Sequence, residues 1–289
     1  MDADDVPRLR SVSPSNTAYA KALRSFLETQ EPLKSGIVVA DKNNDLYPRS
    51  LRKSFNSELA SYTKFPELSF TGGTIDTDAA PGVFVPVVTN ICNAVNDPAN
   101  PLDMIFYAGR VADFRALADS LENRTCVSKP ITVLVGATGF NAAQQYAEVL
   151  NKGNVTVLYA TSADAPAWIG GEPGTPEGFE DFAESFRSKG FAESSLADGY
   201  AIMHHDALAS AASAIGLAAQ GRPVPTAQDV DTQFSNLSLA STVRAASGTL
   251  SFPDAAIGRA VGKVIPIRQI GLKTSQLPTD RIPYVTMAE

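Results

Sequence analysis

The feature that most constrains the fold is a regular alternation of short apolar runs with longer amphipathic stretches between about residues 36 and 160. The apolar runs are short and rich in β-branched residues, as buried strands are, and the intervening stretches have helical spacing of apolar residues. The predicted strands are 37–40, 67–70, 104–107, 131–135 and 155–159, and the predicted helices between them are 47–61, 83–95, 112–121 and 141–150. Because only a crossover connection returns a chain to the same edge, this order predicts an α/β fold with a doubly wound, Rossmann-like parallel sheet.

The flanking segments lack this regular alternation. One helix is predicted before the first strand, at 17–27, and an irregular excursion rich in Pro and Gly at 161–176. The remaining predicted elements are helices at 179–188, 201–219 and 226–239 and strand-like runs at 251–252 and 264–267. The helix at 201–219 is rich in alanine.

Composition excludes several classes of protein. With 44% hydrophobic and 19% charged residues, the chain is unlike a disordered protein. Its 24 Lys and Arg against 31 Asp and Glu, with no basic run, disfavour binding to nucleic acid or to anionic membranes. No segment reaches the roughly 18–20 uninterrupted apolar residues of a membrane span, and the acidic start MDADDVPRLR does not have the pattern of a secretory signal.

The most conspicuous motif is a glycine-containing turn at residues 136–142, which follows the strand at 131–135 and opens a helix. Its string GATGF resembles the cofactor loop of extended short-chain dehydrogenases, in which the backbone approaches a pyrophosphate. Against this, the turn follows the fourth predicted strand instead of the first, no Tyr-x-x-x-Lys pair exists, and the third glycine is replaced by Ala142. We interpret the motif as a strand-to-helix turn and keep an NAD(P)-dependent dehydrogenase as the weaker alternative.

Other catalytic and metal-binding arrangements have little support. Both histidines lie in the run His204-His205-Asp206, and adjacent helical residues point about 100° apart, so the two rings do not converge on one metal. This run is expected on a helix surface. No Gly-x-Ser-x-Gly turn is present, and no spacing supports a Cys–His pair. The sequence therefore predicts a protein that is not an enzyme and has no cofactor and no metal.

Residues that follow strand ends form a candidate binding rim. Asp45 and Tyr47, the turn around Asp76, Arg110 and the segment 138–140 all come after predicted strands. In open parallel sheets, ligands bind in the crevice at the carboxyl ends of the strands. A solvated rim of caps and turns without a ligand is the open alternative.

Several short motifs occur in the order and spacing of one known family. They are the segment 8–16 with its helix, the strand 36–41, the turn 45–48, the strand 102–110, the helix 199–215 and the turn 247–254. The helix carries His205-Asp206-Ala207 where the family has "YDA", and the turn is similar to its "G-x-x-x-F-D" motif. The chain thus resembles the type I periplasmic-binding-protein fold, in particular the branched-chain amino acid and extracellular ligand-binding receptor group.

This resemblance implies an extracellular or cell-surface protein that holds a small solute between two closing lobes, usually as the binding component of an ABC-type uptake system. Its ligand-binding residues would be Asp45, Tyr47, Arg110, Thr138 and Phe140. Thr138 stands where amino-acid-binding members often have an acidic residue, and Arg110 where the family often has an aromatic one. A small polar or anionic ligand is therefore expected. The alternative is a sensing or adaptor domain of a larger cell-surface protein with a degenerate site.

The resemblance also implies a domain organisation. Residues 12–198 with 258–280 would form the second-lobe α/β domain, and 199–257 the helical part of an incomplete first lobe. The Ala-rich helices would then expose an apolar face, which the remainder of a longer, membrane-anchored chain or a homo-oligomer would cover. Cys92 and Cys126 would both lie at the amino-terminal edge of the sheet, where we expect a disulfide away from the ligand.

Overall fold

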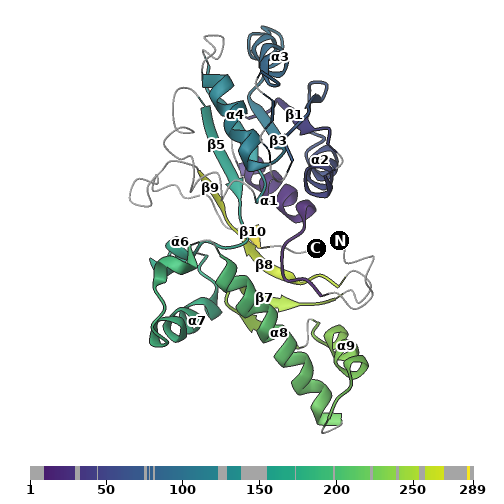
Figure 1. The fold of residues 1–289 in the computed structure, drawn as a ribbon, viewed down its shortest axis with the longest axis vertical. Helices are drawn as coiled ribbons and strands as arrows, with labels where there is room; N and C mark the ends of the chain where they lie inside the picture. Colours follow the sequence, from purple (N-terminus) through teal and green to yellow (C-terminus); the bar gives the residue numbers. More distant parts are fainter. Residues whose placement is uncertain are drawn as a thin grey trace. The chain divides into compact units, whose positions relative to one another are not determined.

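The computed structural model of the chain describes residues 10–29, 33–43, 45–74, 77, 79–80, 82–122, 129–137, 155–172, 174–197, 199–221, 224–238, 241–253, 258–269 and 285–286. The chain divides into two compact units, whose elements are labelled in Figure 1. Unit 1 comprises Met1–Ser15, Ser162–Pro266 and Tyr284–Glu289, and unit 2 comprises Asn16–Thr161 and Ile267–Pro283.

Unit 2 is built on a six-stranded sheet of order β2-β1-β3-β4-β5-β9. Its strands are β1 (Gly36–Asp41), β2 (Leu68–Phe70), β3 (Met104–Ala108), β4 (Ile131–Val135), β5 (Val155–Ala160) and β9 (Ile267–Gln269). The first five pair in parallel, and β9 pairs antiparallel with β5. All five predicted strands of the alternating region are confirmed. They are nearly continuous apolar runs because both faces of the sheet are covered.

Helices lie on both faces of this sheet. They are α1 (Asn16–Thr29), α2 (Leu46–Glu58), α3 (Val85–Val95) and α4 (Val111–Glu122). The first two contact each other on one face, where Phe55 packs on Phe106 of β3. On the other face, α3 and α4 share a core with side chains of the same strands. The doubly wound α/β architecture is therefore confirmed, while the predicted helix at 141–150 lies outside the described residues.

Unit 1 combines a four-stranded antiparallel sheet with helices. The sheet order is β10-β8-β7-β6, with β6 (Val243–Ala245), β7 (Gly248–Ser251), β8 (Val261–Ile265) and β10 (Val285–Thr286). The helices are α6 (Ala165–Ile169), α7 (Glu177–Ser188), the 3-10 turn η2 (Glu193–Leu196), α8 (Tyr200–Gly221) and α9 (Ala227–Asn236). The segment 161–176, predicted to be irregular, contains α6, because Trp168 is buried against Phe179 of α7.

The unit boundaries differ from the predicted domain boundaries at residues 12–15, 162–198 and 258–266, which were predicted in the second-lobe domain and lie in unit 1. The largest of these segments is 162–198. The physical reason is a shared core. Trp168 of α6 and Phe179 of α7 are buried in one cluster with Ile202 of α8 and Ala246. These apolar contacts join the segment after β5 to the helices that follow it.

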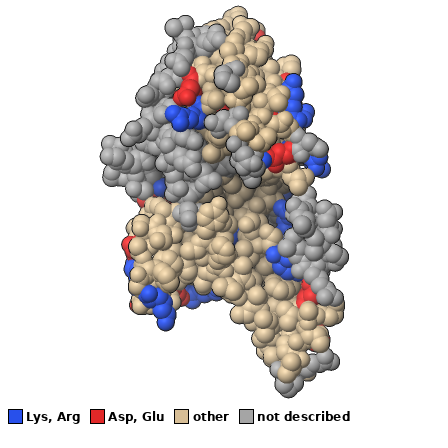
Figure 2. Space-filling view, in the orientation of Figure 1, with Lys and Arg blue, Asp and Glu red and all other residues tan. Residues whose placement is uncertain are grey.

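The helix α8 exposes several large apolar side chains, as the sequence predicts. Leu208 is 72% exposed and Ile215 48% exposed, and Tyr200 is also exposed. The only charged residue of this 22-residue helix, Asp206, is buried, and Figure 2 shows little charge over α8. None of the described helices is long and apolar enough to cross a membrane.

Cys92 lies near the end of α3 and is almost completely buried. Cys126 lies outside the described residues. The Cys92–Cys126 disulfide therefore stays a prediction.

Candidate functional site

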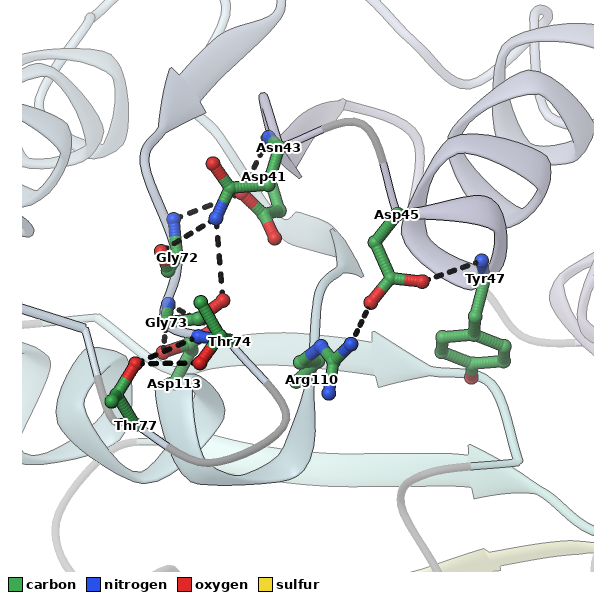
Figure 3. Close-up of polar contacts among 10 residues, drawn as sticks. All are labelled: Asp41, Asn43, Asp45, Tyr47, Gly72, Gly73, Thr74, Thr77, Arg110 and Asp113. Atoms are coloured by element: carbon green, nitrogen blue, oxygen red, sulfur yellow. Dashed lines mark hydrogen bonds and ion pairs between the residues drawn. The ribbon is translucent and has the colours of Figure 1, made fainter.

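The loops after β1, β2 and β3 meet at the carboxyl edge of the unit 2 sheet. Figure 3 shows the polar side chains and glycines of these loops beside one another. This edge is where open parallel sheets bind ligands. The structure describes three of the predicted ligand residues here, Asp45, Tyr47 and Arg110, whereas Thr138, Phe140 and Asp76 lie outside the described residues.

Asp45 and Arg110 form an ion pair across this edge, between Asp45 Oδ2 and Arg110 Nη2. The other carboxylate oxygen of Asp45 accepts a hydrogen bond from the backbone N–H of Tyr47 at 3.2 Å and so caps α2. Both side chains are partly exposed, but Nε of Arg110 is buried and has no hydrogen-bond partner among the residues that the structure describes. The pair balances the charge of the guanidinium and leaves Nε as a buried donor for another group.

Tyr47 lies in the first turn of α2, and its hydroxyl reaches Gly136, the residue that follows β4. Its hydroxyl oxygen is 3.2 Å from the position that a Cβ at Gly136 would take, and side-chain atoms of Leu51 are equally close to that position. Glycine at 136 therefore lets α2 pack closely on the turn, where a Cβ would force these side chains to shift. This packing gives the first glycine of the GATGF motif a structural reason, while the helix predicted after the turn lies outside the described residues.

Two carboxylates that sequence reasoning did not single out organise the same edge. Asp41 Oδ1 accepts hydrogen bonds from the backbone N–H groups of Gly72 and Asn43, both at 2.9 Å. Asp113 Oδ1 accepts from those of Gly73 at 3.1 Å and Ala79 at 3.0 Å. Each carboxylate thus ties its own element to the loop after β2. A usable signal was present, since Asp41 ends an otherwise apolar strand and Asp113 lies in the first turn of α4.

The side chain of Asn43 completes this network. Its Nδ2 donates to the carbonyl oxygens of Gly72 at 2.6 Å and Gly73 at 3.2 Å. The loop after β2 is therefore held through both its N–H and its carbonyl groups, as Figure 3 shows.

Tyr107, a fully buried residue of β3 in the core of unit 2, connects this edge to the core. Its hydroxyl donates to the backbone carbonyl of Arg110 at 2.9 Å, which fixes the turn that carries the guanidinium. Burial, followed by the negative charges of Asp113 and Asp41, raises the pKa of Tyr107 well above its ordinary value. The hydroxyl therefore stays protonated and acts as a donor.

In unit 1, Asp206 is a buried anchor and not a surface residue, so the expectation that the whole His204-His205-Asp206 run lies on a helix surface is wrong for Asp206. It accepts hydrogen bonds from the backbone N–H of Ala246 at 2.9 Å and from the hydroxyl of Ser247, and Nζ of the buried Lys263 lies 3.2 Å away. Burial acts to raise the pKa of Asp206, but the hydrogen bond with His205, the charge of Lys263 and the Ser247 bond together lower it.

Beside this anchor is a shallow cavity of about 200 Å³, lined by Gly178, Asp181, Phe182, Ser185, His205 and Arg244. Arg244 is bound there to Asp181 at 3.3 Å. Within the described part of the chain, no three or more His, Cys, Asp or Glu residues are grouped to hold a metal.

Searches of protein-family models and of curated proteins find no match. Solved structures do match. An ABC transporter substrate-binding protein from Desulfitobacterium hafniense in complex with Leu has a TM-score of 0.63 and 16% identity, covering 98% of this chain and 69% of that chain. A branched-chain amino acid ABC transporter protein from Thermus thermophilus with bound valine has a TM-score of 0.60 and 14% identity, covering 97% of this chain and 67% of that chain.

A third match is the leucine-, isoleucine-, valine-, threonine- and alanine-binding protein from Brucella ovis, with a TM-score of 0.58 and 13% identity, covering 96% of this chain and 63% of that chain. The chain thus spans about two thirds of the length of these structures. At such low identity the likeness shows the fold. The chain has the α/β fold of ABC-transporter substrate-binding proteins, that is, the type I periplasmic-binding-protein fold, and the predicted resemblance is confirmed.

Proposed function

We propose that this chain is a solute-binding domain that works by binding and not by catalysis. The observation that carries the proposal is the Asp45–Arg110 pair at the carboxyl edge of the unit 2 sheet, with the buried Nε of Arg110, which has no hydrogen-bond partner in the described part of the chain. Proteins of the same fold from D. hafniense and T. thermophilus hold Leu and valine. A small solute is therefore the class of ligand that this fold and this edge favour.

The ligand we propose is small and polar or anionic, held by Asp45, Tyr47 and Arg110 together with Thr138 and Phe140. A guanidinium is a planar donor suited to carboxylates and other anions. Since Asp45 already balances its charge, we expect Arg110 to bind the ligand mainly through directed hydrogen bonds, with only modest affinity gained from net charge.

The location and partners follow from the same proposal. The domain would act outside the cell or at the cell surface and deliver its solute to an ABC permease, or it would belong to a longer, membrane-anchored chain. The exposed apolar side chains of α8 would be covered by that further chain or by a second copy.

The test is a thermal-shift screen of acidic, neutral and basic metabolites, followed by calorimetry. We expect acidic or polar metabolites to raise the melting temperature, and Arg110→Gln to weaken binding at least tenfold, which corresponds to about 1.4 kcal/mol. The matched control is Arg115→Gln, because Arg115 is an exposed arginine of α4 that pairs with Asp119. Stabilisation by neutral apolar metabolites alone, or unchanged binding by Arg110→Gln, would contradict the proposed ligand class.

A sensing or adaptor domain with a degenerate site is the second candidate. The observation that favours it is the ion pair itself, because Asp45 occupies part of the guanidinium that an anion would otherwise bind. Failure of every metabolite to shift the melting temperature would favour this candidate. An increase in melting temperature produced by NAD(P) would instead support the dehydrogenase alternative.

A further inference from the structure

Two buried carboxylates converge beside Gly72 at the end of β2. Asp41 is 2% exposed and Asp113 is 1% exposed. The position that a Cβ at residue 72 would take lies 2.5 Å from Asp113 Oδ2 and 2.7 Å from Asp41 Oδ2. The two oxygens therefore both lie against Gly72, where a larger residue would displace them; Figure 3 shows both side chains around the loop that contains this glycine.

Asp41 Oδ2 is an unsatisfied acceptor in this region. It is buried and makes no hydrogen bond to any of the described residues, whereas Oδ1 of the same carboxylate accepts two backbone N–H groups. The described part of the chain places no cationic side chain in an ion pair with Asp41, and Arg110 of the same rim pairs with Asp45. A buried carboxylate oxygen without a donor or cation carries an uncompensated desolvation cost.

The two carboxylates also act on each other and on their surroundings. Like charges at this proximity repel each other unless a positive charge lies between them. Both contribute to the raised pKa of the buried Tyr107, so their charges reach the core of unit 2. A bound cation would offset the repulsion and satisfy Asp41 Oδ2 at once.

We propose that Asp41 and Asp113 bind a hard divalent cation, Ca²⁺, at the end of β2. Carboxylate oxygens are the ligands this ion prefers, at about 2.3–2.6 Å, and it tolerates irregular coordination. Because the described residues hold no group of three such side chains, water and backbone carbonyl oxygens complete the shell. With two carboxylates we expect a dissociation constant of roughly 0.1–1 mM. This site does not depend on the proposed solute-binding function.

The first experiment follows thermal unfolding of chelator-treated protein as CaCl₂ is added, with NaCl at matched ionic strength. The wild type should gain several degrees in melting temperature with CaCl₂ only. Asp41→Asn keeps the shape and hydrogen bonds of the side chain but removes its charge, and it should lose the gain. The matched control is Asp103→Asn, since Asp103 also accepts backbone N–H groups, those of Lys34 and Ser35, away from this site.

The second experiment needs no variant. Tb³⁺ replaces Ca²⁺ and luminesces when a nearby tyrosine absorbs light, and Tyr107 is close enough to both carboxylates to feel their charge. Tyrosine-excited Tb³⁺ emission that CaCl₂ displaces would support the site. The proposal is overturned if CaCl₂ stabilises the protein no more than NaCl, if Asp41→Asn keeps the wild-type gain, or if no displaceable Tb³⁺ emission is seen. Solute binding by Asp41→Asn separates this result from the solute-binding proposal.

Discussion

At the scale of single residues, the most consequential interaction in unit 1 is the buried pair of Asp206 and Lys263. We predict that Lys263→Met destabilises the protein by about 3–5 kcal/mol, because it leaves the Asp206 carboxylate buried without its cation. Urea unfolding measures this loss. The control, Lys189→Met, replaces an exposed lysine of the same unit and should change stability little. A Lys263→Met protein as stable as the control would show that the pair contributes little.

The same pair gives stability a dependence on pH. Because the pKa of Asp206 is lowered in the folded state, the unfolded chain binds the proton more tightly. This contribution is fully present above the ordinary carboxyl pKa and is lost as the pH falls through the lowered, folded value. The free energy of unfolding of the wild type should therefore fall in acid, and Lys263→Met should show a smaller fall over that range.

Residues at strand ends could be predicted from the sequence, and residues in cross-loop networks could not. Asp45 follows β1 and Arg110 follows β3. The carboxyl edge of a parallel sheet brings such positions together regardless of which side chains they carry. The roles of Asp41 and Asn43 depend on hydrogen bonds to Gly72, which no local pattern encodes. The pairing of Lys263 with Asp206 likewise joins β8 to α8 across distant parts of the sequence.

At the scale of elements, the strands of unit 2 were predictable because each is a continuous apolar run between helices. In contrast, β6 and α6 were missed. Val243–Ala245 is a strand because it pairs antiparallel with β7, and α6 forms because its apolar residues are buried beside α7. Both elements are short and owe their structure to tertiary contacts, which outweigh local propensity.

The prediction at this scale concerns the exposed apolar side chains of α8, Leu208 and Ile215. We expect the protein to self-associate at high concentration, and Leu208→Gln with Ile215→Gln to shift it toward monomer, because the pair removes exposed apolar surface. Analytical ultracentrifugation over a concentration series measures the change. His204→Gln, a polar replacement at an exposed position of the same helix, is the control. A wild type that stays monomeric throughout would contradict the expectation.

At the scale of the whole molecule, the predicted disulfide is open to a direct chemical test. We expect the unfolded, unreduced protein to contain no free thiol, because Cys92 and Cys126 are its only cysteines and are predicted to pair. Thiol titration in denaturant counts them, and the same sample after reduction should give two. Two thiols before reduction would refute the bridge.

The fold class could be predicted because the alternation of strands and helices leaves few topologies open. The division into units could not, because it depends on which side chains share a core. The segment 162–198 follows β5 directly in the chain, yet its buried residues share a core with Ile202 of α8 and with Ala246. Its position in the sequence favoured assigning this segment to the domain that contains β5, whereas its apolar packing places it in unit 1.

The pairing of β9 with β5 also has a consequence for how the protein is made. During translation β5 (Val155–Ala160) is synthesised well before β9 (Ile267–Gln269). Until β9 is present, the edge of β5 that pairs with it has backbone N–H and C=O groups without a strand partner. An apolar edge strand of this kind is a template for pairing with other chains. Synthesis therefore passes through an interval in which β5 is exposed to aggregation, and chaperone protection would matter most until residue 269 has emerged.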